Sequence, residues 1–305
     1  MDCRNKLAEI KGQQTGVIDC HTHAGISVYN YARTIYPSVQ SIEDLVRKAL
    51  YNNVNWLICT SMSMYLPFEA VESKKQFPYE LSNNYLMMET ALFGANVLPF
   101  AAYHPTENVR KQCDLLESLH AKFGLYGLKL FTLETNCGVT EINPLLLELA
   151  SKNNWPILTH SGRDLASHPL NVIRFAEKYP EVRVCVAHCG RFLKKFWCEV
   201  IQHPNIYVDV SPFLLLCKDA SEKDEIGLLP LDYNSPEKVI IELNNLIPKR
   251  LLWGTDEPWT KVTRTWKDRE ARGTNYEREK MFLDSLTVSI RKDIAWLNTR
   301  AYLGI

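Results

Sequence analysis

The 305-residue sequence lacks any apolar run near the ~20 residues that span a bilayer. Residues 1–16 also lack the apolar core of a signal peptide. Lys+Arg and Asp+Glu balance at 35 each, and no polybasic run or basic helix face stands out. These absences argue against a membrane or nucleic-acid partner. We therefore expect a cytoplasmic protein that acts on a small molecule.

Cysteine and glycine motifs are missing as well. The nine cysteines are an odd number and include no CxxC pair. Cys20, Cys59 and Cys185 lie in apolar runs, where a free thiol behaves as a small buried hydrophobe, so we expect a reducing compartment. No Gly-rich dinucleotide or phosphate motif follows any predicted strand, which weakens an open doubly wound sheet as the fold.

What the sequence does contain is one unit repeated along its length: a short apolar strand and an amphipathic helix. Eight such strands are predicted, each apolar enough to be covered on two faces. They span residues 17–23, 56–60, 97–103, 126–131, 156–160, 182–188, 206–210 and 251–255. No Pro/Gly-rich linker divides them. The pattern predicts an α/β fold, a single-domain (β/α)8 TIM barrel over residues 17–305, after an N-terminal lead-in of residues 1–16. Long βα loops are expected at residues 211–235 and 257–275.

The first strand carries a His-x-His pair, His21 and His23. With strict alternation of side chains, the two imidazoles and Asp19 share one face, while Ile18 and Cys20 face the helices. Two imidazoles at this spacing can turn their nitrogens toward one divalent cation. Two surface histidines at a polar strand end are the simpler alternative.

Other polar residues suited to metal or proton chemistry occupy the ends of further strands. In a TIM barrel these ends meet in one basin, where the active site lies. The residues are His160 after the fifth strand, His188 after the sixth, Asp256 after the eighth, and Lys129 within the fourth. Any one of them alone is more often a structural residue than a ligand. Together with the His-x-His pair they predict a metal site.

Several segments, in this order, resemble the amidohydrolase superfamily of metal-dependent TIM-barrel enzymes. They are VIDCHTH, GLKLF, PILTHSG, VCVAHCG and LLWGTDEP, followed by Asn298-Thr299-Arg300-Ala301. Within the superfamily, the resemblance is to the "amidohydrolase 2" branch that includes aminocarboxymuconate semialdehyde decarboxylase. Phe131 departs from the pattern, because many relatives carry a polar residue there.

The resemblance implies a role for each matching residue. His21, His23, His160 and Asp256 would hold one divalent metal ion per chain, expected to be Zn²⁺. Asp256 would also move a proton, and His188 would contact the reacting group. A carboxylated Lys129 bridging two ions is the alternative that two-metal members of the superfamily suggest.

Residues on the loops around this basin are candidate substrate contacts. They are Arg163, whose guanidinium could pair with an anionic group, and the aromatic residues Tyr29 and Trp259. A surface ion pair or loop packing would explain them equally well.

Three functions are compatible with this pattern. The first is a metal-dependent hydrolase that uses zinc-activated water on an amide, lactone or ester of a small polar substrate. The second is a nonoxidative decarboxylase of an aromatic or unsaturated acid at the same site. The third is a barrel that binds a metal structurally without turnover. The sequence names no substrate and leaves a homodimer open.

Overall fold

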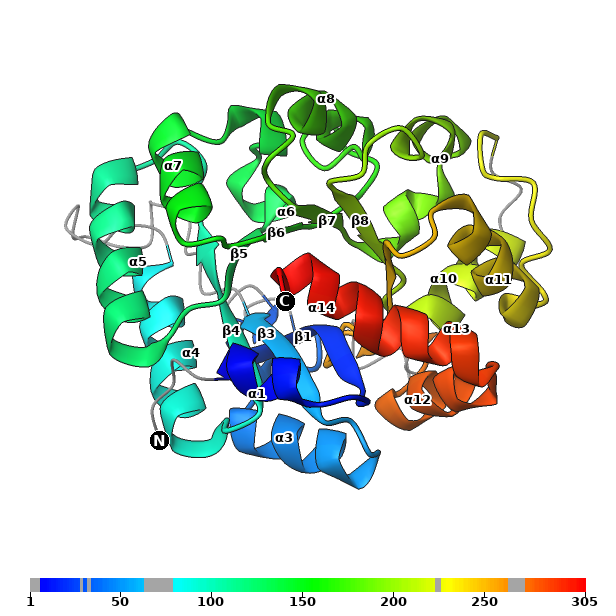
Figure 1. Ribbon diagram of the computed structural model, residues 1–305, viewed down its shortest axis with the longest axis horizontal. Helices are drawn as coiled ribbons and strands as arrows, with labels where there is room; N and C mark the ends of the chain where they lie inside the picture. The colour runs from blue at the N-terminus through cyan, green and yellow to red at the C-terminus, as the bar shows by residue number, and fades with distance from the viewer. Residues whose placement is uncertain (1–5, 28–29, 32–33, 63–78, 223–225, 263–271) are drawn as a thin grey trace.

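The computed structural model describes residues 6–27, 30–31, 34–62, 79–222, 226–262 and 272–305. Eight parallel strands, β1 and β3 to β9, follow one another around the sheet, and helices surround them (Figure 1). These strands are β1 Ile18–Ile26, β3 Trp56–Ser61, β4 Val97–Tyr103, β5 Gly127–Leu130, β6 Ile157–Thr159, β7 Val184–Val186, β8 Ile206–Asp209 and β9 Leu251–Leu252. A short strand, β2 (Val39–Gln40), pairs antiparallel with the end of β1.

Backbone hydrogen bonds close this sheet into a barrel by joining β1 to the segment that follows β9. Cys20 N donates to Trp253 O at 3.1 Å, Asp256 N to His21 O at 2.7 Å, and His23 N to Glu257 O at 2.6 Å. The predicted (β/α)8 barrel is therefore confirmed. Its closure sets the first and last strands side by side, although more than 200 residues separate them.

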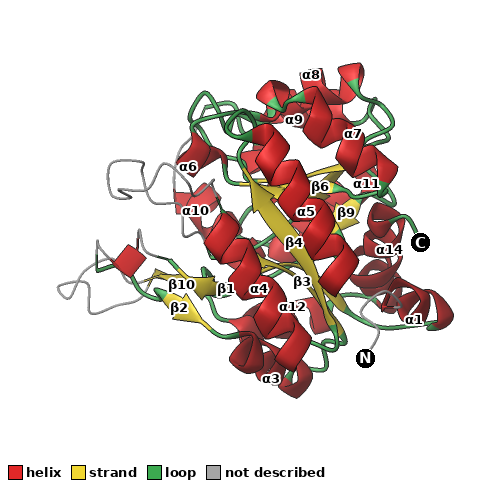
Figure 2. Cartoon of the chain, turned by 90° about the vertical axis from the view of Figure 1, so that its left-hand side faces the viewer, coloured by secondary structure: helices red, strands yellow, loops and turns green. Residues whose placement is uncertain are grey.

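The helices cover the outside of the barrel, as the α4 and α5 helices over β4 illustrate (Figure 2). They are α1 Lys6–Gly12, α3 Ile42–Tyr51, α4 Glu80–Phe93, α5 Val109–Phe123, α6 Thr132–Thr135, α7 Pro144–Lys152, α8 Leu170–Lys178, α9 Lys194–Val200, α10 Phe213–Glu222, α11 Pro236–Leu246, α12 Tyr276–Ser285, α13 Val288–Lys292 and α14 Asn298–Leu303. A short hairpin, β10 Lys261–Val262 and β11 Arg272–Gly273, lies after β9. Among the described residues, no helix is both long and apolar enough to cross a membrane.

The α3 helix shows why these segments become helices. The Ser41 hydroxyl caps its first turn by accepting a hydrogen bond from Asp44 N at 3.1 Å. Ile42, Leu45 and Ala49, spaced three and four residues apart, are fully buried against the sheet. Capping and the apolar stripe act together, because a helix of this length is marginal without packing.

The predicted strict alternation of side chains along β1 is wrong, because a β-bulge interrupts the strand. Asp19 is paired with Leu57 and Thr22 with Cys59, so three steps on β1 match two steps on β3. An extra residue of this kind turns two consecutive side chains toward the same face. Cys20 therefore packs in the cluster of buried side chains inside the barrel, and the next residue, His21, also points inward.

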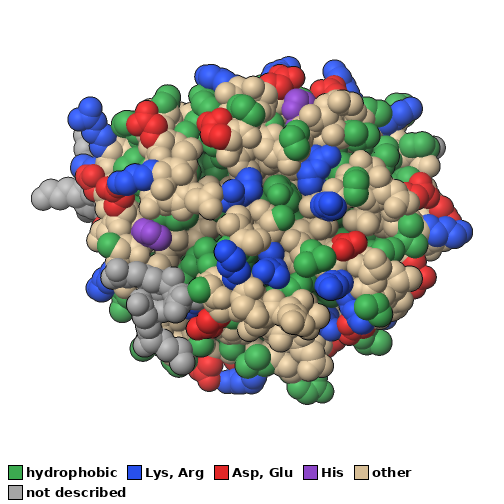
Figure 3. Space-filling model, in the orientation of Figure 1, with side chains coloured by type: hydrophobic (Ala, Val, Ile, Leu, Met, Phe, Trp, Pro, Cys, Tyr) green, Lys and Arg blue, Asp and Glu red, His purple; other side chains and the backbone are tan. Residues whose placement is uncertain are grey.

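The lead-in segment contributes to one end of the barrel. The α1 side chain Ile10 is fully buried with Trp296 and with Tyr302 of α14, against residues of the strand interior. Lys6 anchors α1 by donating from Nζ to the carbonyl oxygens of Gly94 and Val97, each at 2.7 Å. Figure 3 views this end and shows a continuous surface with Lys and Arg side chains near its centre. The strand-end chemistry therefore lies at the other end.

The long connection expected at residues 211–235 is partly helical. The α10 helix occupies Phe213–Glu222 and buries Phe213, Leu216 and Cys217. An apolar run directly after Pro212 supplies this buried face. The helix packs against residues 188–192, which follow β7, and so supports the backbone beside His188.

Candidate active site

One cavity of about 270 Å³ opens at the carboxyl ends of the strands. Its wall collects most of the residues predicted from the sequence, although they come from five different strands and their loops. The lining residues are His21, His23, Ser27, Asn30, Lys129, Phe131, Glu134, His160, His188, Asp256 and Trp259. The predicted basin is thus a real cavity in the fold.

Three predicted ligands lie within contact distance of one another at the base of this cavity. His23 Nε2 is 3.1 Å from His21 Nε2 and 3.1 Å from Asp256 Oδ1, and His21 Nε2 is 3.6 Å from the same oxygen. All three residues are buried. In the described part of the chain, they form one of two groups compact enough to hold a metal ion.

The hydrogen-bond partners of the two imidazoles show that this donor set fits a cation. His21 Nδ1 lies 3.0 Å from Asp209 Oδ2, and His23 Nδ1 lies 2.8 Å from Thr60 Oγ1 and 3.3 Å from the Ser61 carbonyl oxygen. The Asp209 carboxylate and the Ser61 carbonyl only accept, and the Thr60 hydroxyl can accept as well as donate, so a hydrogen at each Nδ1 satisfies these contacts and leaves a lone pair at each Nε2 for a cation. Burial lowers the pKa of His23 to about 3, so this ring is neutral. Three electron-rich atoms therefore face one another, as a divalent metal requires.

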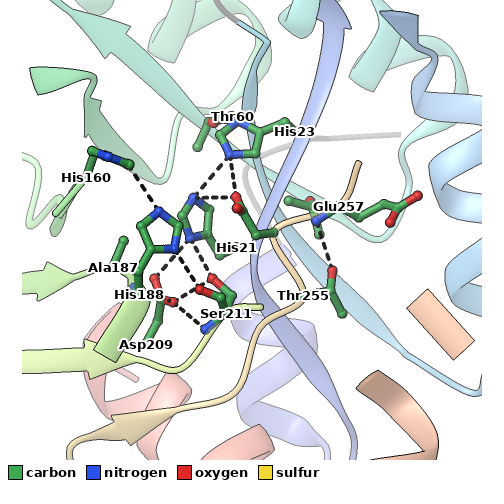
Figure 4. Close-up of polar contacts among 12 residues, drawn as sticks. His21, His23, Thr60, His160, Ala187, His188, Asp209, Ser211, Thr255 and Glu257 are labelled. Atoms are coloured by element: carbon green, nitrogen blue, oxygen red, sulfur yellow. Dashed lines mark hydrogen bonds and ion pairs between the residues drawn. The ribbon is translucent and has the colours of Figure 1, made fainter. Parts of the chain in front are cut away.

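His160 is placed differently from the other predicted ligands. It is absent from both compact groups that the described residues form, and its Nδ1 lies 3.1 Å from His188 Nε2. The close-up shows His160 reaching toward His188, which in turn stands beside His21 (Figure 4). The predicted ligand set is thus assembled for His21, His23 and Asp256, while His160 contacts the predicted catalytic histidine. Metal binding by all four stays a prediction.

His188 is held in one orientation by its backbone and by a strong hydrogen bond. Its Nδ1 lies 2.6 Å from the Ser211 carbonyl oxygen, so Nδ1 donates and Nε2 accepts from His160. Burial lowers the pKa of His188 to about 4. The residue has a left-handed backbone with φ of 60°, and Asp256 has φ of 61°. Such conformations are costly for non-glycine residues and gather at functional sites.

Asp209, at the end of β8, is a site residue that sequence reasoning missed. Besides His21, it accepts hydrogen bonds at Oδ1 from Ser211 N at 2.8 Å, Ser211 Oγ at 2.6 Å and His188 N at 3.3 Å. Burial alone would raise its pKa, but His21 and these hydrogen bonds outweigh burial and hold the pKa well below the usual range. The signal was an acidic residue at the end of an apolar strand.

Asp19 connects the two strands that carry the metal-ligand candidates, and it does so without touching an imidazole. Its carboxylate accepts from Thr255 Oγ1 at 2.7 Å, Thr255 N at 3.0 Å and His21 N at 3.2 Å. Burial raises its pKa to about 7. Asp19 thus holds the backbones of His21 and of the residue before Asp256 at a fixed spacing.

Lys129 lies inside the barrel, almost fully buried, with Nζ 2.8 Å from His21 Nε2. Burial lowers its pKa to about 8. Since His21 Nε2 has a lone pair, Lys129 donates a hydrogen bond to it. The lysine therefore stands at the predicted place on the fourth barrel strand and contacts one of the metal-ligand candidates directly.

The predicted substrate contacts separate into three cases. The Trp259 ring lines the cavity, 6.2 Å from the His23 ring between centroids. Arg163 lines a neighbouring cavity of about 320 Å³ together with Arg191, and it is not among the residues that line the metal-ligand cavity. Tyr29 lies outside the described residues. Phe131 faces His23 with ring centroids 5.8 Å apart, so the cavity is flanked by two aromatic rings.

Solved structures with the same fold share very little sequence with this chain. The 2,6-dihydroxybenzoate decarboxylase from Rhizobium is 13% identical with a TM-score of 0.65, covering 95% of this chain and 99% of its own. The manganese-bound D314N mutant of 5-carboxyvanillate decarboxylase from Novosphingobium aromaticivorans is 9% identical with a TM-score of 0.67, covering 96% and 99%. The 4-oxalomesaconate hydratase from Rhodopseudomonas palustris is 15% identical with a TM-score of 0.61, covering 94% and 95%. No curated protein sequence matches this chain.

A closed (β/α)8 barrel with histidines and an aspartate converging at its strand ends defines a TIM-barrel enzyme of the metal-dependent kind. The family model described as "Amidohydrolase" matches residues 18–305. The chain therefore belongs to the amidohydrolase family, as its sequence motifs predicted. The match begins at β1 and excludes the lead-in segment.

Proposed function

We propose that this protein is a metal-dependent, nonoxidative decarboxylase of a small aromatic or unsaturated carboxylic acid. The observation that carries the proposal is the shape and chemistry of the cavity. Two aromatic rings, Phe131 and Trp259, flank a space of about 270 Å³ whose base holds Lys129 and the converging metal-ligand candidates. A flat acid fits with its ring between the aromatic side chains and its carboxylate toward the base.

The comparisons support this choice over hydrolysis. Several similar structures are decarboxylases of aromatic acids, and at least two of them contain bound manganese. A divalent ion held by His21, His23 and Asp256 would supply positive charge for the substrate's oxygen atoms. Zinc remains our predicted ion, with manganese as the alternative that the similar structures suggest.

Decarboxylation consumes one proton and therefore needs a proton donor near the reacting carbon. The bond between the carboxylate carbon and its neighbour breaks, carbon dioxide leaves, and the electron pair left on the neighbouring carbon takes up a proton. Asp256 lines the cavity beside the other candidate ligands, so its carboxyl group is the candidate proton carrier. Lys129 and the histidines would hold the substrate's oxygen atoms in place while the proton moves.

Hydrolysis of an amide, lactone or ester is the second candidate, and the His160–His188 pair favours it. Hydrolysis moves two protons, one from water and one to the leaving group, and therefore uses two proton carriers. The 3.1 Å contact between His188 Nε2 and His160 Nδ1 provides a second carrier beside Asp256.

Product analysis distinguishes the two reactions. Protein loaded with Zn²⁺ or Mn²⁺ is incubated in D₂O with hydroxybenzoic acids, and separately with lactones and esters in H₂¹⁸O. We expect one carbon dioxide per product and one deuterium on the carbon that lost it, with both lost on chelation. Incorporation of ¹⁸O from water without release of carbon dioxide would support hydrolysis instead.

A further inference from the structure

The segment that follows β1 contributes two polar side chains to the active-site cavity. Ser27 comes directly after the end of β1, four residues beyond His23, and Asn30 follows it. Both residues line the cavity, and they are only 4% and 7% exposed. Four residues of extended chain span at most roughly 14 Å. Ser27 therefore lies no farther than this from the metal-ligand candidate His23 along the strand.

The Ser27 hydroxyl is fixed in place and still has a hydrogen to donate. Ser27 N donates to Ser38 O at 2.8 Å, and Ser27 Oγ accepts a hydrogen bond from Asn30 N at 3.2 Å. A hydroxyl group that accepts in this way keeps one O–H for another partner. Within the described part of the chain, Ser27 Oγ has no acceptor for that hydrogen. Ser27 therefore offers a hydrogen-bond donor to the cavity.

The Asn30 side chain offers an acceptor to the same cavity. Its Nδ2 donates to the Pro37 carbonyl oxygen at 3.1 Å. Because a carbonyl oxygen only accepts, this contact identifies the NH₂ end of the amide and leaves Oδ1 at the other end. Asn30 Oδ1 has no hydrogen-bond partner among the described residues, and it is not enclosed by protein atoms. This oxygen is therefore open to the cavity that Asn30 lines.

The donor and the acceptor are neighbours, because the 3.2 Å hydrogen bond joins the Ser27 hydroxyl to the backbone of Asn30. A neutral donor beside a neutral acceptor matches a hydroxyl group, which accepts with a lone pair and donates its hydrogen. An ether oxygen could only accept from Ser27. An amino group on an aromatic ring would mainly donate to Asn30.

We propose that Ser27 and Asn30 are specificity-determining residues that recognise a hydroxyl group on the acid that this cavity binds. The hydroxyl group would accept from Ser27 Oγ and donate to Asn30 Oδ1. An acid without this group would displace water from both polar atoms and leave them unpaired, which is costly in a buried site. This substrate class rests on the proposed decarboxylase function of the same cavity.

The test uses benzoates that differ in one ring substituent. Protein loaded with Zn²⁺ is titrated calorimetrically with benzoate and with its 3- and 4-substituted hydroxy, methoxy and amino derivatives. We expect the wild type to bind one hydroxybenzoate ~10-fold more tightly than benzoate, because two neutral hydrogen bonds contribute ~3-fold each. The methoxy and amino derivatives substituted at the same ring position make one bond each, so their affinities should lie between these two.

Two variants should weaken different ligands. Ser27→Ala removes the donor, so it should weaken the hydroxy and methoxy derivatives ~3-fold and leave the amino derivative unchanged. Asn30→Leu removes the acceptor, so it should weaken the hydroxy and amino derivatives ~3-fold and leave the methoxy derivative unchanged. A segment that had merely lost its structure would weaken all ligands alike. Ser289→Ala on α13 and Asn245→Leu on α11, both at exposed positions, are the matched controls and should keep the wild-type affinities.

Binding and turnover separate this inference from the function on which it rests. The crossed pattern in the two variants, with no carbon dioxide released from any acid, would support Ser27 and Asn30 and reject the decarboxylase. Carbon dioxide release, with all ligands weakened equally or not at all in the variants, would do the reverse. A wild type that binds benzoate as tightly as both hydroxybenzoates, or that binds none of these acids, overturns the inference.

Discussion

Replacing Asp209 by Asn should weaken metal binding although Asp209 is not expected to touch the metal. Three of its four hydrogen bonds, from Ser211 N, Ser211 Oγ and His188 N, go to Oδ1, which the asparagine carbonyl can replace. The fourth, from His21 Nδ1 to Oδ2, meets the new amide NH₂. Two donors then face each other, so the hydrogen bond that orients the His21 ring and fixes its hydrogen at Nδ1 is lost.

The size of the effect follows from the role of this contact. Removing a carboxylate that orients a metal-binding histidine costs 10- to 100-fold in metal affinity, about 1.4 to 2.8 kcal/mol. Stability should change much less, because three hydrogen bonds survive. We expect Asp209→Asn to show this loss when apoprotein is titrated with Zn²⁺ against a competing chelator. Asp114→Asn, an exposed aspartate on α5, is the matched control.

The reasoning fails if Asp209→Asn binds Zn²⁺ as tightly as the wild type while its thermal unfolding is normal. The hydrogen on His21 would then not depend on Asp209, and the inward lone pair would need another explanation. An equal loss in Asp114→Asn would point to a general effect of charge.

Three further changes test other parts of the site. Asp256→Asn should fold but lose turnover by ~10²-fold or more, because it removes the proton carrier, and initial rates at saturating substrate measure this. Lys129→Met should leave one metal ion per chain by elemental analysis, whereas a fall from two ions to one would establish a bridging lysine. Burial raises the pKa of Glu279 to about 8 from 4.5, because the buried carboxyl group is costly to ionise. The stability that the neutral carboxyl group contributes is therefore complete below pH 4.5 and is lost as the pH rises to 8. Glu279→Gln should therefore raise the melting temperature at pH 8 and leave it unchanged at pH 4.5, and equal shifts at both values would contradict this sign.

The barrel was predictable because its signals are local. Each strand is a short apolar run that must be covered on two faces, and each polar strand end is visible in the sequence itself. The α10 helix lies inside the connection that was expected as a long loop at residues 211–235. Its signal is local, because Phe213, Leu216 and Cys217 have helical spacing. The bulge in β1 gave no such signal, since it depends on how β1 pairs with β3.

The part of the site that escaped prediction depends on contacts between distant strands. Asp209 reads as one acid in the run Ile206–Asp209 until the closed barrel brings it within 3.0 Å of His21. His160 stands at a strand end like any other candidate ligand, and only its 3.1 Å contact with His188 shows its partner. Residue types therefore predicted which side chains could bind a metal or carry a proton. The distances in the structure show which of these side chains contact one another.

Which nitrogen of each imidazole carries the hydrogen decides whether the ring can bind a metal ion. The hydrogen-bond partners on the far side of the ring determine this. Asp209 accepts a hydrogen from Nδ1 of His21, and the Ser61 carbonyl accepts one from Nδ1 of His23, which also contacts the Thr60 hydroxyl at 2.8 Å. The two Nε2 lone pairs, left 3.1 Å apart beside Asp256, repel each other unless positive charge lies near them. Lys129 supplies one such charge at 2.8 Å from His21. A divalent ion that binds here must therefore share His21 Nε2 with that lysine or displace it, which makes the Lys129 side chain part of any account of metal affinity.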